Sequence, residues 1–514
     1  MTYFSAADWA VIALYLTGII LLGIWFGRDQ KNTRDYFLGS KSIPWWGIGL
    51  SIVAAETSAL TIIGVPGLAY GSDLALIQMI VGYVIARIIL AAVMVPHYLR
   101  GEIYSPYELL ANRFGAGGRR TAGGLFLLSE TLAAGVRVYV VSIPIQLMLG
   151  VNIITALILF VVLSLIYTYI GGVKAVIWTD AVQFGLFLAG GLFTLCYVPT
   201  VMEGGWSRIW EQASAAGKLH WLNTQFSLSS PINIWMGVIG GTVQVMSSHG
   251  AEQLIVQRVL ACRTIRDGRK ALVLSAALVF PLFLVFLLVG AMLWVFYQNH
   301  PMAIPIPENR EGMKANDFVY PIFMLTEVPH VLKGFLIVAI LSAAMSSVSS
   351  ALTSLSSVST MDFVKPLRPG RSDLYYLRFS KYSTVLWAVG LIGVGYLSRK
   401  VPFVFDAAFS LRGLTSGALL GSLLLAILLR KGRQLSVVAG MLVALLVMTG
   451  IEVLPKLDLT KSFWNRVVGR EIYWPWYTLI GTIVCLTVVG IIELLLGKPP
   501  PSQASTPAPT RANT

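Results

Sequence analysis

The sequence is poor in charged residues and in cysteine. Asp, Glu, Lys and Arg together make up 12% of the 514 residues, and the three cysteines, Cys196, Cys262 and Cys485, lie far apart. This wide spacing indicates neither a disulfide framework nor a metal site. The sequence also contains no phosphate-binding P-loop and no residue pattern typical of a catalytic site. We therefore expect neither an ATP-driven pump nor an enzyme.

Long apolar segments make up most of the chain instead. Hydrophobic residues form 56% of the sequence, and they recur in runs of about 20, the length that crosses a bilayer. These runs predict an all-α polytopic membrane protein with about 13 transmembrane helices. The first run has no basic start and no cleavage site, so we expect a retained helix. The predicted spans are 7–27, 45–70, 72–98, 121–149, 152–170, 178–200, 231–256, 271–298, 331–360, 377–397, 404–428, 434–454 and 473–496.

Basic residues are concentrated on one side of the predicted spans. With the N-terminus outside, the inside segments hold 24 of the 38 Lys and Arg residues. Positive charge favours the cytoplasmic side, so we predict an inner-membrane protein with its N-terminus outside and its C-terminus in the cytoplasm. This orientation accounts for the net charge of +14, and no nucleic-acid partner is expected. The tail 498–514, rich in Pro, Ser and Thr, is predicted to be a disordered cytoplasmic segment.

One apolar span carries a stripe of hydroxyl groups. In the run 342–362, SAAMSSVSSALTSLSSVSTMD, serine and threonine recur at steps of three and four, which places them on one helix face. Lipid offers hydroxyls no hydrogen-bonding partner, so this face is expected to meet protein, water or an ion. A packing face of small residues and a polar site both fit the pattern.

Two spans are interrupted by polar and small residues. Residues 54–59 interrupt the second span, whereas Gly240, Gly241 and 247–250 interrupt the seventh. The two spans are five apart, and interrupted helices at matching positions are typical of transporters with inverted repeats and a site at the breaks. Two ordinary helices kinked at glycine are the alternative.

Asp180 is an ionisable residue near the inner end of the sixth span. Such residues are costly in a membrane and usually functional. Beside the hydroxyl stripe, its carboxylate would suit a hard cation, with Ser346, Ser349 and Ser350 supplying further oxygens. The other interpretation is a buried carboxylate that bonds a helix N-terminus.

Arginine and glutamate also share the fourth span. Glu130 and Arg137 are seven residues apart, so they lie on one helix face, and Arg87 is a possible third member of the set. Arg137 either belongs to this ion-pair set or faces a cavity, where a guanidinium binds carboxylates in a bidentate manner.

Three further polar residues lie near the breaks. Glu56 either lines the cavity or bonds a helix end. His249 contacts substrate, responds to protons or packs in the interior. Arg412, in the eleventh span, either lines the outer vestibule or extends its charge to the interface.

Four stretches of the sequence resemble motifs of the sodium:solute symporter family, in order and in spacing. They are DYFLGSKSIPWW (35–46), YTYIGGVKAVIWTDAVQ (167–183), EQLIVQRVLACR (252–263) and SAAMSSVSSALTSLSSVSTMDF (342–363). The resemblance covers roughly 7–430. It implies a leucine-transporter-type fold with two inverted five-helix repeats. The implied division is one transporter domain, 1–497, with a leading helix (7–27), a first repeat (45–200), a second repeat (231–428) and two additional helices (434–496).

The resemblance also implies where sodium binds. The family's main sodium site is similar to the backbone carbonyls of Ala54, Thr57 and Ala343 and the hydroxyls of Ser346 and Ser347. Carbonyls of a broken helix are expected to bind the cation. A second sodium site, present in some members, has the pattern of Asp180, Ser346, Ser349 and Ser350, so we predict two sodium ions per cycle.

The implied substrate site departs from that of sugar carriers. The positions at which sugar carriers place polar sugar-binding groups are similar to Ile80, Val245 and Phe409 here, which are apolar. Arg137 resembles the arginine with which sialic acid carriers bind a carboxylate. A small organic anion is therefore the first prediction, and a sugar, polyol, amino acid or vitamin stays open. The predicted substrate contacts are Glu56, Ser58, Thr61, Arg137, Ser248 and His249.

The predicted function is sodium-coupled import of a small organic solute by alternating access. Sodium and substrate must bind one state of the carrier better than the other for their transport to be coupled. Sodium is the only ion or cofactor expected, and the lipid bilayer is the expected surrounding, with no obligate protein partner. A channel and a transporter-like sensor are the rival functions, and saturable sodium-dependent uptake separates a carrier from a channel.

Overall fold

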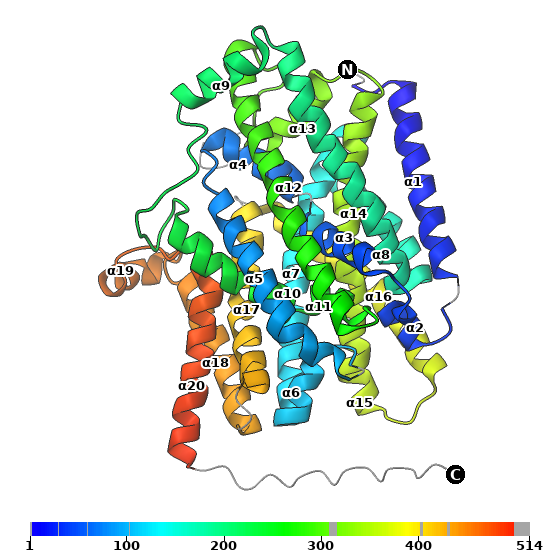
Figure 1. The fold of residues 1–514 in the computed structure, drawn as a ribbon, viewed down its shortest axis with the longest axis vertical. Helices are drawn as coiled ribbons and strands as arrows, with labels where there is room; N and C mark the ends of the chain where they lie inside the picture. Colours follow the sequence, from blue (N-terminus) through cyan, green and yellow to red (C-terminus); the bar gives the residue numbers. More distant parts are fainter. Residues whose placement is uncertain are drawn as a thin grey trace.

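The computed structural model describes residues 3–28, 30–58, 60–101, 103–307, 316–400, 404–428 and 432–497. Within these ranges the chain is helical and has no strand, and the helices form one tall bundle (Figure 1). The predicted disordered tail, 498–514, lies outside the described residues. The helices are α1 (Ala6–Gly27), α2 (Thr33–Leu38), α3 (Trp45–Glu56), α4 (Val65–Gly71), α5 (Ile77–Leu99), α6 (Tyr107–Phe114), α7 (Ala116–Leu149), α8 (Ile153–Val201), α9 (Gly205–Ala215), α10 (Thr242–Gly250), α11 (Gln253–Leu260), α12 (Ile265–Asn299), α13 (Val319–Thr326), α14 (Leu332–Val358), α15 (Lys365–Leu367), α16 (Asp373–Leu397), α17 (Val404–Leu428), α18 (Gln434–Val453), α19 (Asp458–Val467) and α20 (Tyr477–Leu496).

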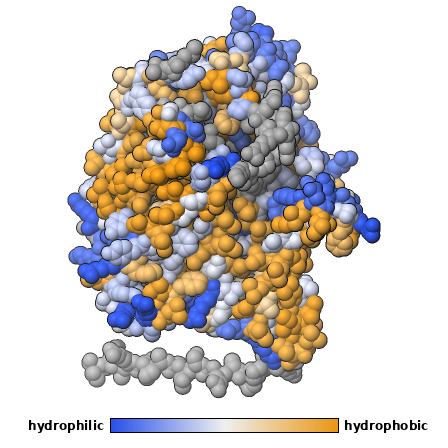
Figure 2. All heavy atoms as spheres, turned by 180° about the vertical axis from the view of Figure 1, so that it is seen from behind, coloured by the Kyte–Doolittle hydropathy of each residue, from blue (hydrophilic) through white to orange (hydrophobic). Residues whose placement is uncertain are grey.

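Nine helices among the described residues are long and apolar enough to cross a membrane, or ten if the bent pair α3 and α4 counts as one span. The prediction of about 13 spans differs for two reasons. Helix α8 has 49 residues and covers two predicted spans. Helix α16 and the segment around α10 are not among the helices that are both long and apolar enough. Hydrophobic side chains cover much of the face of the bundle that Figure 2 shows, as expected for contact with lipid.

Helix α8 turns sharply at Gly172. This residue has φ +54° and ψ −155°, a conformation available essentially to glycine alone. A Cβ atom there would also lie 2.5 Å from the carbonyl oxygen of Tyr36. The two predicted spans 152–170 and 178–200 therefore follow one another without a loop, and Asp180 lies on the second of them.

The first predicted break is present. Helix α3 ends at Glu56, Thr57 is extended (φ −78°, ψ 104°), and the chain continues through η2 (Leu60–Gly64) into α4. The two halves are bent by 61°. Because the last carbonyls of a helix lose their backbone partners, this break presents carbonyl oxygens inside the bundle.

The second break lies a little later in the chain than predicted. Gly240 and Gly241 belong to a π-helical turn, η3 (Met236–Gly241), that runs straight into α10. The backbone becomes extended at Glu252 (φ −101°, ψ 133°), between α10 and α11. Gly241 instead permits close packing, since a Cβ atom there would lie 2.8 Å from the carbonyl oxygen of Met79 on α5.

Helix α14, with the hydroxyl stripe, lies at the centre of the bundle. It contacts α1, α3, α7, α8 and α16, and every residue from Leu336 to Val358 is buried. The stripe therefore meets protein on all sides. Its inner part packs as small residues, with Ser354 donating a hydrogen bond to the Ala351 carbonyl (3.0 Å) and Thr360 to that of Ser356 (2.8 Å).

Candidate functional site

A cavity with about 920 Å³ of empty space, part of it open to solvent, lies between the two breaks. Its wall is formed by both broken helices and by α5, α7, α12, α17 and the start of α20. All six residues predicted to contact substrate lie in this wall. The lining residues are Glu56, Ser58, Thr61, Tyr83, Arg137, Gln244, Val245, Ser248, His249, Glu252, Leu254, Ile255, Phe283, Ala408, Phe409, Arg412, Gly413, Ser416, Trp474 and Thr478.

Glu56 and His249 share a buried partner, Arg87 of α5. The Arg87 guanidinium pairs with Glu56 and donates to the Tyr83 carbonyl (3.0 Å), and its Nη2 lies 3.1 Å from His249 Nε2. A guanidinium can only donate, so His249 Nε2 accepts and its proton sits on Nδ1, 2.8 Å from Ser248 Oγ. His249 is therefore a neutral imidazole, fixed in orientation at the cavity wall. Arg87 pairs with Glu56 and not with Glu130, contrary to the predicted set.

Two more ion pairs border the cavity. Arg412 lines the cavity and donates from Nε to Glu252 (2.6 Å) at the second break, so it does not extend its charge to the interface. Arg137 Nη2 lies 3.5 Å from Glu130 Oε1, and both oxygens of Glu130 are buried without a hydrogen-bond partner. The Arg137 pair is thus the loosest of the three.

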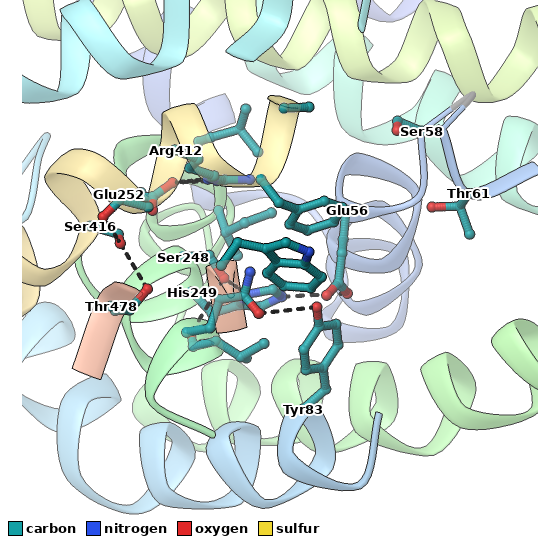
Figure 3. A pocket seen from close by; sticks show the side chains of 18 of the residues that line it. Glu56, Ser58, Thr61, Tyr83, Ser248, His249, Glu252, Arg412, Ser416 and Thr478 are labelled. Carbon is teal, nitrogen blue, oxygen red and sulfur yellow. Dashed lines mark hydrogen bonds and ion pairs between the residues drawn. The ribbon is translucent and has the colours of Figure 1, made fainter. Parts of the chain in front are cut away.

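The charges around the cavity balance. Three guanidiniums face three carboxylates, and His249 is neutral. The guanidiniums are those of Arg87, Arg137 and Arg412. Figure 3 shows Arg412 beside Glu252 on one side, with Glu56, Tyr83 and His249 grouped on another and Ser58 and Thr61 farther off. The three carboxylates are those of Glu56, Glu130 and Glu252.

Aromatic side chains form the apolar part of the wall. Phe409 stacks on Trp474, with ring centroids 4.7 Å apart and planes 23° apart. Tyr83 meets Phe283 edge to face at 6.4 Å, and its hydroxyl donates to Gln244 Oε1 (3.3 Å). Val245 and Phe409 line the cavity as expected from the sugar-carrier positions, whereas Ile80 is buried elsewhere.

The predicted main sodium residues lie where α3 breaks and where α14 passes it. Ala54, Thr57 and Ala343 are fully buried, and α3 contacts α14. Ser347 Oγ donates to the Ala343 carbonyl (3.1 Å), and Ser346 Oγ to Asp180 Oδ1 (2.6 Å). The hydroxyl of Thr57 is buried without a hydrogen-bond partner. The break between α3 and α4 therefore contributes both to the cavity wall and to the predicted main sodium residues.

Two of the predicted second sodium residues, Asp180 and Ser350, contact a guanidinium, whereas Ser349 donates to the Ser346 carbonyl of its own helix (3.0 Å). Arg258 of α11 donates from Nη2 to Asp180 Oδ2 (2.8 Å) and to Ser350, and from Nε to Ser51 Oγ (2.8 Å), which itself donates to Asp180 (2.6 Å). Asp180 thus bonds neither a helix N-terminus nor hydroxyls alone. The sequence could have indicated this pair, because Arg258 lies in an apolar stretch and a buried arginine requires an acidic partner.

Other wall residues escaped the sequence interpretation. They lie on different elements and share no spacing with the predicted set, so only tertiary packing brings them to the cavity. They are Tyr83, Gln244, Glu252, Phe283, Ser416, Trp474 and Thr478.

Comparison with known proteins places this architecture. The model of the family described as "Sodium:solute symporter family" matches residues 36–444. The chain is 29% identical over 457 residues to the sodium/sialic acid symporter SiaT of Proteus mirabilis (strain HI4320), covering 86% of this chain and 89% of that protein. It is 26% identical over 445 residues to the human sodium/iodide cotransporter, covering 85% and 68%.

Two solved structures are similar in fold. A substrate-bound, outward-open Na⁺-coupled sialic acid symporter matches with a TM-score of 0.85 and 25% identity, covering 96% of this chain and 99% of that one. Mhp1, a nucleobase-cation-symport-1 family transporter, matches with a TM-score of 0.56 and 13% identity, covering 89% and 94%. The leucine-transporter-type fold is confirmed. Because the family model spans most of the chain, this protein belongs to the sodium:solute symporter family of multi-pass membrane transporters and is not an enzyme.

Proposed function

We propose that the protein imports a small organic carboxylate together with sodium by alternating access. The observation that carries this proposal is Arg137, a guanidinium in the cavity wall whose own carboxylate partner is 3.5 Å away. Arg87 and Arg412 each donate closer hydrogen bonds within the protein. The similarity to sialic acid symporters, which carry an organic anion, supports the same choice.

Charge balance explains why one anion fits. With three guanidiniums against three carboxylates, the cavity has no net charge to repel an anion. A carboxylate that reached Arg137 could take a bidentate hydrogen bond, which is among the stronger ones available. A sugar or polyol would need many hydrogen-bonding partners, and Ser248, Ser416 and Thr478 each already use part of their capacity within the wall.

The proposed sodium position is the main site at the first break. Sodium takes oxygen ligands, as hard cations do, and the oxygens of Ala54, Thr57, Ala343, Ser346 and Ser347 belong to two elements. Binding there would tie α3 to α14 and shape the adjacent cavity wall, which supports coupling. A second sodium at Asp180 and Ser346, with Ser349 and Ser350, would require Arg258 to turn away first.

The proposed setting is the inner membrane, with the N-terminus outside and the C-terminus in the cytoplasm. The distribution of basic residues supports this orientation. Uptake into proteoliposomes of known protein orientation, with and without an inward sodium gradient, tests the proposal against a panel of carboxylates, sugars and amino acids. If no carboxylate accumulated in a sodium-dependent manner, the proposal would be wrong.

Arg137→Lys keeps the charge but removes the planar fork. We expect the half-saturation concentration for the best carboxylate to rise about tenfold or more, since a hydrogen bond between charged groups is worth about 1.5–3 kcal/mol. The maximal rate should change less. Concentration-dependent uptake measures both values. Arg412→Lys is the control, and a larger effect there would move the carboxylate contact away from Arg137.

Ser347→Ala removes a predicted sodium ligand from α14. We expect the half-saturation concentration for sodium to rise severalfold while the folded protein stays stable, because the Ser347 hydroxyl bonds only its own helix. Ser354→Ala is the matched control, a buried serine of α14 with the same kind of bond to its own helix. Sodium activation of uptake, measured at fixed substrate, distinguishes them. Equal values for both variants would remove Ser347 from the site.

A further inference from the structure

We propose that Trp474, supplied by a helix outside the ten-helix core, is a specificity-determining residue that selects carboxylates carrying a planar apolar group. This inference rests on the proposed transport of a carboxylate and names the part of the substrate that Arg137 would not touch. The match to the family model ends at residue 444, yet Trp474 and Thr478 lie in the cavity wall.

The end of the chain that carries Trp474 is held firmly against the cavity. A Cβ atom on Gly417 of α17 would lie 2.6 Å from the Gly481 Cα of α20, so the two backbones touch there. Ser416 and Thr478 exchange a hydrogen bond (2.8 Å) across the same contact. The η7 turn (Trp474–Trp476), which leads directly into α20, is therefore held beside α17.

Contacts from a distant loop also position the turn that contains Trp474. Tyr473 N–H donates to the Leu228 carbonyl (2.9 Å), and Trp476 Nε1 donates to that of Ser227 (3.3 Å). Trp474 itself is only 4% exposed and stacks on Phe409 of α17. The indole is thereby fixed in the cavity wall, with a small part of its surface exposed there.

The remaining wall determines which chemistry this indole would meet. Phe283 and Tyr83 add apolar faces, and the nearby polar groups are engaged: Gln244 holds the Tyr83 hydroxyl and Ser248 holds His249. A carboxylate at Arg137 would thus have its other end among aromatic rings. Aromatic rings prefer a stacked or edge-to-face partner, so a planar apolar group fits better than a chain of hydroxyls.

Competition uptake with the full-length protein tests this inference. Benzoate and phenylacetate serve as planar probes, acetate and lactate as carboxylates without a ring, and sialic acid as a polyol carboxylate. With an inward sodium gradient, we expect the planar probes to bind about tenfold more tightly than acetate or lactate. Equal or weaker binding of benzoate and phenylacetate would overturn the inference while leaving carboxylate transport intact.

Three substitutions distinguish a specificity role of Trp474 from general packing. Trp474→Ala should weaken the binding of the planar probes about tenfold and that of acetate little. Trp474→Phe keeps a ring and is the safer variant for folding, so it should retain most of the preference for planar probes. Trp476→Phe, a neighbouring buried tryptophan outside the cavity wall, should leave the preference unchanged. If Trp474→Phe and Trp476→Phe lowered the uptake of all substrates equally, Trp474 would be a packing residue. If no carboxylate accumulated with sodium at all, the proposed function itself would fail.

Discussion

Asp180→Asn should destabilise the folded protein by about 3–5 kcal/mol, the usual effect of removing one partner from a buried ion pair. Asp180 and Arg258 are both within 2% of full burial, so the substitution leaves a guanidinium without its counter-charge. The thermal midpoint of the purified protein in detergent measures the loss. The size of the effect comes from the charge that remains, and only partly from the bond that is lost.

A second substitution provides the control for this prediction. In Asp180→Asn combined with Arg258→Met, neither charge is left buried, so we expect much of the stability to return. Sodium dependence of the midpoint adds a functional readout, since a second sodium that displaces Arg258 would protect the unsubstituted protein and not Asp180→Asn. Full stability of Asp180→Asn alone would contradict the buried pair.

Gly172→Ala should destabilise the protein by about 2–6 kcal/mol. Backbone strain at this conformation contributes about 1–3 kcal/mol, and overpacking against Tyr36 contributes a similar amount. The yield of monodisperse protein and its thermal midpoint both report the loss. Gly172 sets the direction of the helix segment that carries Asp180, so its substitution acts on the fold. We therefore expect transport to fall in proportion to the amount of folded protein.

Gly185→Ala is the matched control on the same helix. A Cβ atom at Gly185 would meet nothing within 4 Å, and alanine favours a helix over glycine by about 1 kcal/mol. The substitution should therefore be neutral or slightly stabilising. If the two alanine variants behaved alike, the sharp turn at Gly172 would not be needed for the fold.

Local sequence features were enough to predict most of the architecture. Apolar length marks the spans, and the polar residues at 54–59 mark the first break correctly, because lipid tolerates neither charge nor unpaired backbone. The second break was placed slightly too early. Of its predicted residues, 247–250 end directly before it, whereas Gly241 packs closely against α5 and Gly240 against Pro475, and neither glycine opens the helix. Glycine alone does not reveal which of these two roles it has.

Pairing between distant residues could not be predicted. Helix periodicity joined Glu130 to Arg137 correctly, because both lie on one helix. Periodicity could not predict the pairs Arg87–Glu56 and Arg258–Asp180, because the two members of each pair lie 31 and 78 residues apart on different helices. The same holds for Trp474, which is brought to the cavity by the packing of α20 on α17 and by contacts with the loop at 227–228.

The guanidinium at Asp180 has an electrical consequence for the transport cycle. Arg258 is a cation that belongs to the chain, so it is not released to the cytoplasm when the carrier opens inward. One sodium with one monoanion would then move no net charge, and uptake would be indifferent to membrane potential. If a second sodium replaced Arg258 beside Asp180, each turnover would carry one charge, and a potential of 100 mV would add about 2.3 kcal/mol to accumulation. The voltage dependence of uptake therefore reports which cation neutralises Asp180.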